Sequence, residues 1–351
     1  MDEMLTKDII NRGNLIYEQF LELVKAYMPQ KWYESKLEFK IYDDNEINGR
    51  SWCEGNKDCI EINSGVIELY YNYFSKAMEY DKVSFLKNIM PDKGEEEIEE
   101  IFIEGVTFEN GRPHFFDHRI IDDIKAKMLE IFVSRFIFLH ELGHILNGHC
   151  KLLANKTHDT AYFMPMYYND NNKPENETEA LDIRTLEMDA DAFAATQSMT
   201  HLLYLYEHSE EEIRVPYMEP LDIFYWWAFA IRSHFLICED TFGDSALYNK
   251  WITHLPSNAR WTMIYSSVTE VIDFYNKSRE EKRLFKKKIT EGALDAEIKF
   301  NNIKLTNYNW GEQIQNNGQY LKYSREVNAN WEMLKKELGE YTRLPLYEDV
   351  D

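Results

Sequence analysis

Residues 121–147 have the sequence IDDIKAKMLEIFVSRFIFLHELGHILN. Apolar side chains recur at three- and four-residue spacing over this whole segment, which predicts one long and largely buried helix. Gly148 follows directly, and glycine most readily adopts the left-handed conformation that ends a helix. The pattern therefore predicts a helix that ends at Asn147, with two histidines in an apolar setting near its end.

These histidines belong to His140-Glu141-Leu142-Gly143-His144, an H-E-x-x-H pattern. Residues i and i+4 share a helix face, so both imidazoles can reach one ion at ~2.0–2.1 Å from each nitrogen. Glu141 is displaced around the helix and within reach of a metal-bound water, which suits a general base. Two histidines and a glutamate are costly to bury without a partner. The pattern therefore favours a zinc site over a helix whose histidines only pack.

A catalytic zinc needs a third protein ligand and an open fourth position. The segment LEMDADAFAA, residues 186–195, is the candidate, because Glu187 and Asp191 lie one helical turn apart. Glu187 has the reach to bind the metal, and Asp191 is placed to hold a ligand histidine through its other ring nitrogen. Two alternatives stay open: Asp189 or Asp191 as the third ligand, and an ordinary helix with an acidic face.

Two further segments contain histidines that we considered as members of the site. An all-histidine site needs its third histidine ten residues after the first, where Cys150 stands, so we exclude that type of site. His149 is interpreted as a residue at a helix C-terminus, where the dipole favours it. In THLPSNAR, residues 253–260, His254 or Arg260 is placed to donate to the oxyanion of a hydrated carbonyl. A surface histidine and a salt-bridged arginine would give the same pattern.

Together, HELGH, LEMDADAFAA and THLPSNARWTMIYSS resemble the motifs of gluzincin-type zinc peptidases. They are similar to those of the membrane-embedded HtpX and CAAX-prenyl-protease superfamily. They are more similar to those of the soluble phage-exclusion peptidases of the Lit type, which share an aromatic helix after a strand, here residues 59–74, and the histidine five residues after the second ligand. The likeness covers residues 55–275 with gaps, and Leu255 stands where the family usually has proline.

This resemblance implies a zinc-dependent endopeptidase with a zincin-like fold. The implied site residues are the zinc ligands His140, His144 and Glu187, the catalytic residues Glu141, His254 and Arg260, and Asp191 as the acid that orients a ligand histidine. The resemblance also implies a protein substrate in the translation machinery and an antiphage role, switched on by a phage component or another partner protein.

Two other functions stay open. A regulatory metallopeptidase would cleave a repressor in stress or mobile-element control, often beside a DNA-binding domain, although no basic recognition helix is evident here. A structural zinc protein would have a closed site with four ligands and no turnover.

The chain has 351 residues, of which 44% are hydrophobic, and a formal net charge of −23 at pH 7. This composition excludes a mainly disordered chain. The negative charge opposes binding to phosphate backbones and anionic lipids, so we expect neither nucleic acid nor a membrane as partner. No apolar run approaches the ~20 residues of a membrane helix, and the N-terminus lacks the pattern of a secretory signal. We therefore expect a cytoplasmic protein.

Local patterns predict a predominantly helical α+β protein. The expected elements are a helix at 5–28, a small antiparallel sheet from strands at 36–42, near Trp52 and at 57–62, a hairpin at Asn110-Gly111, and helices from Asn63, from Thr178, over 219–240, 257–276 and 278–300, and near Trp331. The expected domains are a zincin-like peptidase domain at 1–276, with the N-terminal helix and sheet in 1–120 and the zinc-site helices in 121–276, and a helical extension at 277–351 packed on it.

The segment 151–177 connects the two helices that carry the metal motifs, and we expect it to be a loop beside the site. Its stretch YFMPMYY, residues 162–168, is unusually apolar for a loop. We hypothesise that this stretch covers the active site until a partner displaces it. Packing on the surface as a small separate core is the alternative.

Overall fold

The computed structural model describes residues 36–44, 48–89, 105–109, 112–116, 118–157, 164–165, 174–208, 219–242, 253–304 and 317–344, together with Gly13, Glu18, Glu22 and Lys25. Those four single residues are helical and belong to the helix predicted at 5–28, the rest of which lies outside the described residues.

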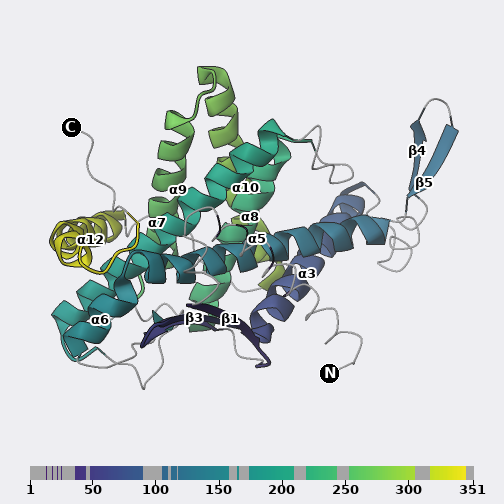
Figure 1. Cartoon of the computed structure of the whole chain (residues 1–351). Coiled ribbons are helices and arrows are strands. Elements are labelled where there is room, and N and C mark those ends of the chain that lie inside the picture. The colour runs from purple at the N-terminus through teal and green to yellow at the C-terminus, as the bar shows by residue number, and fades with distance from the viewer. Residues whose placement is uncertain are drawn as a thin grey trace.

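The described chain is mostly helical, with a small sheet at one side (Figure 1). The helices are α3 (Ser64–Ile89), α5 (His118–Leu146), α6 (His149–Thr157), α7 (Glu177–Glu207), α8 (Asp222–Phe242), α9 (Ser257–Phe274), α10 (Arg279–Lys304) and α12 (Asn317–Leu338). Helix α5 runs through the middle of the molecule and packs against α3, α7 and α8. Within the described residues, no helix combines the length and the apolar composition that crossing a bilayer requires.

Helix α5 is central because it contributes to both large hydrophobic cores. Val133, Ile137 and Leu142 face the core formed with α3 and the sheet. Phe136 and Leu139 face the other core, which α7, α8, α9 and α10 complete. A helix that is apolar on several faces has to be buried on several faces, so the end of α5 lies deep in the protein.

The sheet has the order β1-β3-β2-β6, formed by β1 (Leu37–Tyr42), β2 (Gly49–Glu54), β3 (Lys57–Asn63) and β6 (Met164–Pro165). Strands β2 and β3 are antiparallel, but β1 and β3 are parallel, so the prediction of a purely antiparallel sheet is wrong. After the tight turn at Gly55, β3 returns between β2 and β1. Strand β3 is buried along nearly its whole length, whereas β1 alternates between half-buried and exposed. The strand in the central position is therefore the most buried one.

The predicted hairpin is present as β4 (Gly105–Glu109) and β5 (Arg112–Phe116), which pair with each other and not with the main sheet. Helix α7 begins at Glu177, one residue before the predicted Thr178, because the side chain of Asn176 accepts a hydrogen bond from the Glu179 amide at 3.0 Å and forms the N-cap.

The segment predicted as a loop at 151–177 starts as helix α6, so this part of the prediction is wrong. Met164 and Pro165 pair with β2, next to Arg50 and Ser51. The rest of the apolar stretch 162–168 lies outside the described residues, and its covering role stays a prediction.

Two C-terminal helices lie against the body of the protein, since α10 packs along α8 and α12 along α7. After α12, the amide of Arg343 donates to the Leu146 carbonyl at 2.8 Å, so the chain covers the last turn of α5. The division into domains at residue 276 stays a prediction.

The Gly148→Ala variant is expected to lower the free energy of unfolding by about 2 kcal/mol or more. Gly148 has a φ of +84°, and a Cβ there would lie 2.6 Å from the carbonyl carbon of Tyr341. Gly55→Ala is the matched control, because Gly55 has a φ of +58° with no atom within 4 Å of the added Cβ. Gly55→Ala should lower the free energy of unfolding only by the cost of placing alanine in the left-handed conformation, about 1 kcal/mol. Equal losses for both variants in denaturant unfolding would contradict the packing of Tyr341 against Gly148.

Candidate metal centre

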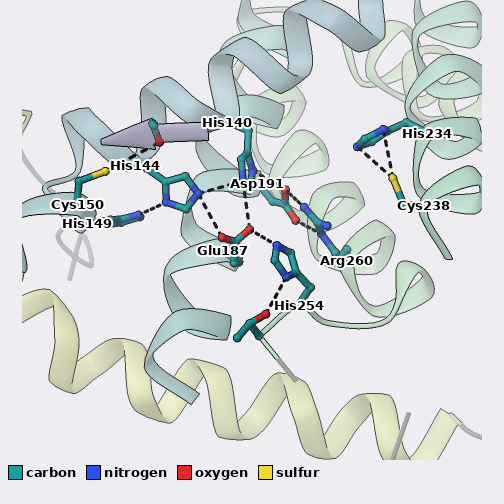
Figure 2. Close-up of polar contacts among 12 residues, drawn as sticks. His140, His144, His149, Cys150, Glu187, Asp191, His234, Cys238, His254 and Arg260 are labelled. Carbon is teal, nitrogen blue, oxygen red and sulfur yellow. Dashed lines mark hydrogen bonds and ion pairs between the residues drawn. The ribbon is translucent and has the colours of Figure 1, made fainter. Parts of the chain in front are cut away.

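Small residues let the helices α5 and α7 approach each other closely at the site. A Cβ added to Gly143 would lie 3.3 Å from the Cα of Ala190, so the two backbones are nearly in contact. Glu187 lies one turn before Ala190 on α7, and its side chain therefore reaches the imidazoles of α5 (Figure 2). The close approach explains how residues 43 positions or more apart come to share one site.

Three side chains direct ligand atoms towards one another, at separations close to those of a tetrahedral metal site. His140 Nε2 lies 3.0 Å from His144 Nε2 and 3.2 Å from Glu187 Oε2, and His144 Nε2 lies 3.4 Å from Glu187 Oε1. Bonds of ~2.0–2.1 Å in a tetrahedron separate the ligand atoms by about 3.3–3.4 Å. All three side chains are buried. Among the described residues, this is the group whose ligand atoms converge within 4.8 Å.

Asp191 fixes the orientation of His140. The Nδ1 of His140 lies 2.9 Å from Asp191 Oδ1, and Arg260 donates to both oxygens of that carboxylate at 2.7 Å. Burial raises the pKa of Asp191, but the ion pair with Arg260 outweighs it and holds this pKa well below its usual range. A carboxylate at Nδ1 keeps a proton on that nitrogen, so Nε2, which faces Glu187, is the nitrogen that can bind a metal ion.

In the protein without metal, a protonated His140 supplies positive charge next to Glu187 and Asp191. Burial lowers the pKa of His140, but Asp191 and Glu187 more than reverse this and raise it to about 10. Burial holds the pKa of His144 well below its usual range, so that ring is neutral. An ion that binds here therefore displaces a proton from His140.

His149 orients the second ligand, which the sequence interpretation missed. It opens helix α6 and is fully buried, so its assignment to a helix C-terminus is wrong. Its Nδ1 lies 2.9 Å from His144 Nδ1, and its Nε2 lies 3.1 Å from Asp189 Oδ2, off the line of a good hydrogen bond. The sequence feature that could have indicated this role is a third histidine, five residues after His144, followed closely by the apolar residues Leu152 and Leu153.

Glu141 has the environment of a general base. Its side chain is fully buried, and neither carboxylate oxygen has a hydrogen-bond partner of good geometry among the described residues, although Ser51 of β2 lies beside it. Burial raises the pKa of Glu141 to about 7. A buried carboxylate without a partner is costly, and a neighbouring cation or water would relieve that cost.

The loop before α9 brings His254 to the same place. His254 Nε2 lies 3.1 Å from Glu187 Oε2 and has no hydrogen bond of good geometry among the described residues. Arg232 of α8 positions this loop, because it donates to the side chains of Ser257, at 3.2 Å, and Asn258. Leu255, at the position where the resemblance expects proline, is buried against Ala259.

Arg260 was predicted as a second candidate for stabilising an oxyanion. The structure instead places it on Asp191 through Nε and Nη2, where it is almost fully buried. Asp189 and Asp191, the alternative third ligands, each contact the far nitrogen of a histidine and lie outside the converging group. Within the described residues, the group has three ligands and lacks the fourth of a closed structural site.

The residues present could therefore hold a metal ion, for three reasons. The ligand atoms have tetrahedral spacing, the far nitrogens of both histidines are occupied, and Glu187 Oε2 is buried without a hydrogen-bond partner of good geometry. No protein-family model, no curated protein and no solved structure matches the chain.

Proposed function

We propose that this protein is a zinc-dependent endopeptidase that hydrolyses peptide bonds of a protein substrate. The observation that carries the proposal is the convergence of His140, His144 and Glu187, with the carboxylate of Glu141 next to them in a buried site. Three protein ligands and an adjacent carboxylate are the arrangement of a catalytic zinc with a free position.

Each neighbouring residue has a separate task in hydrolysis. Zinc, when bound, polarises the scissile carbonyl and makes water more acidic. Glu141 accepts a proton from the attacking water and passes it to the leaving amine, for which a pKa near 7 is well suited. His254 donates from Nε2 to the oxyanion that forms on the carbonyl. Asp191 and Arg260 keep the His140 ring in one orientation.

The biological part of the proposal depends on the sequence motifs. Their resemblance to the phage-exclusion peptidases supports an antiphage effector in the cytoplasm that cleaves a protein of the translation machinery after a partner activates it. The net charge of −23 supports a protein substrate over a nucleic acid.

The test is metal-dependent cleavage of a cell extract. The purified protein is added to the extract in its zinc-loaded form, after removal of the metal with a chelator, and after return of zinc, and new N-termini are mapped by mass spectrometry. Cleavage sites should appear with zinc, disappear without it and return with it. Sites that persist after chelation, or the absence of any site in an extract containing phage proteins, would contradict the proposal.

His254→Leu is expected to lower kcat by about 10²-fold, because leucine has no group that can donate to the oxyanion. Zinc content and KM should stay nearly unchanged, since His254 is not one of the three converging ligands. His208→Leu is the matched control, because His208 stacks on Tyr204 at the exposed end of α7. Loss of zinc in the His254 variant would show that this residue is a metal ligand and contradict its role as a donor.

A further inference from the structure

A cavity lies beside α7, on the side of this helix that faces away from Glu187. It has a volume of about 630 Å³, and its lining residues come from α7, α9 and α12 together with the ends of α5 and of the described chain. A helix turns by about 100° per residue. Glu187 and Asp191 therefore lie on one face of α7, whereas Asp189, Phe193 and Thr196, which line the cavity, lie on the opposite face. The cavity is thus separate from the metal centre.

The lining has the chemistry of a site for a cation with an apolar stem. Four aromatic side chains contribute to it, from Phe193, Phe274, Tyr275 and Trp331, and Asp189 and Glu270 supply carboxylates. Aromatic faces attract a guanidinium or ammonium group, and arginine stacks on them best because it is planar. The side chain of Asp189 is 17% exposed, and no hydrogen bond from the described residues reaches its Oδ1.

Asp189 also connects the cavity to the metal centre. Its Oδ2 accepts a hydrogen bond from Asn147 and lies 3.1 Å from His149 Nε2. His149 in turn lies 2.9 Å from the Nδ1 of the metal-facing His144. A ligand that holds Asp189 through Oδ1 would leave Oδ2 on His149 and restrict the motion of both groups. The metal ligand His144 would then be held more firmly.

We propose that this cavity binds an arginine side chain, flanked by apolar residues, of a partner protein, and that its occupancy strengthens zinc binding through Asp189 and His149. The negative charge of the whole chain, −23, favours such a cationic partner. Binding of arginine in the cavity does not depend on the proposed hydrolysis. The coupling between this binding and zinc affinity rests on the proposal that zinc binds at the His140 site. Since binding and not cleavage is measured, failure of the coupling and failure of the peptidase proposal are distinguishable.

The test uses the full chain with Glu141→Gln, so that a peptide is not consumed. Calorimetric titration compares acetyl-Phe-Arg-Leu-amide with the same peptide containing citrulline, which keeps the shape of arginine and removes its charge. The arginine peptide should bind at least about tenfold more tightly, because neutral citrulline lacks the charge that strengthens the hydrogen bond to the carboxylate and the attraction to the aromatic faces. Adding Asp189→Asn should abolish this preference. Asp273→Asn, an exposed acid on α9 outside the cavity lining, should leave it unchanged.

Zinc affinity, measured by competition with a chelating dye, tests the coupling. Saturation with the arginine peptide should tighten zinc binding by about fivefold or more, and zinc should tighten peptide binding by the same factor. In the Asp189→Asn protein this effect should disappear. Equal binding of both peptides, or no loss with Asp189→Asn, would overturn the cation site. Arginine-selective binding without a change in zinc affinity would overturn the coupling.

Discussion

Replacing Glu141 by glutamine is expected to lower kcat for peptide-bond cleavage by about 10³-fold while zinc stays bound. Glutamine keeps the size of the side chain and removes its ability to accept a proton. The Glu141 carboxylate is not one of the three converging ligands, so the zinc content should not change. The measurement is turnover of a substrate identified in the extract, together with the zinc content of the same sample.

Glu141→Asp provides the matched control, because it keeps the carboxylate and withdraws it by one methylene. Activity of this variant should fall between those of the wild type and Glu141→Gln. Full activity of Glu141→Gln would exclude Glu141 as the base. Loss of zinc in that variant would instead place Glu141 among the ligands and contradict the geometry in which it stands beside the metal centre.

Glu187→Gln is expected to weaken zinc binding by roughly 10²–10³-fold, since ~10–16 kcal/mol of zinc binding free energy is shared among about four ligands. At a limiting zinc concentration, the rate of cleavage should fall in proportion to the fraction of protein that still binds zinc. Competition with a chelating dye measures the affinity, and a return of activity at high zinc concentration would show that the rest of the site is intact.

Glu207→Gln is the control for this variant, because Glu207 lies at the exposed end of the same helix and forms an ion pair with Lys277. It removes one negative charge from α7 and should leave zinc affinity unchanged. An equal loss of zinc affinity in both variants would mean that the removed negative charge, and not the loss of a metal ligand, weakens zinc binding. Unchanged zinc affinity in Glu187→Gln would exclude Glu187 as a ligand.

The metal-site helices could be predicted from the sequence because their signals are local. The periodicity of residues 121–147 gives the extent of α5, and the i, i+4 spacing of Glu187 and Asp191 indicates one helix face. The capping of α7 shows the limit of such signals. Asn176 and Thr178 both have side chains suited to an N-cap, and only the folded chain selects Asn176.

Features that depend on contacts between distant residues could not be predicted. The parallel pairing of β1 with β3 depends on the order and direction of the strands in the sheet, which no local pattern encodes. His149 meets Asp189 across forty residues, and Gly148 indicates a helix end without showing that a new helix begins at the next residue. The pairing of Arg260 with Asp191 likewise required the fold.

The central claim is that the HExxH histidines and the carboxylate of Glu187 hold one zinc ion and leave a position for water. Zinc X-ray absorption spectroscopy on the metal-loaded wild-type protein, with metal content measured on the same sample, tests it most directly. The account predicts one zinc per chain with two imidazoles and otherwise oxygen ligands at ~2.0–2.1 Å. No stoichiometric zinc, a sulfur ligand, or a shell of four imidazoles would contradict it.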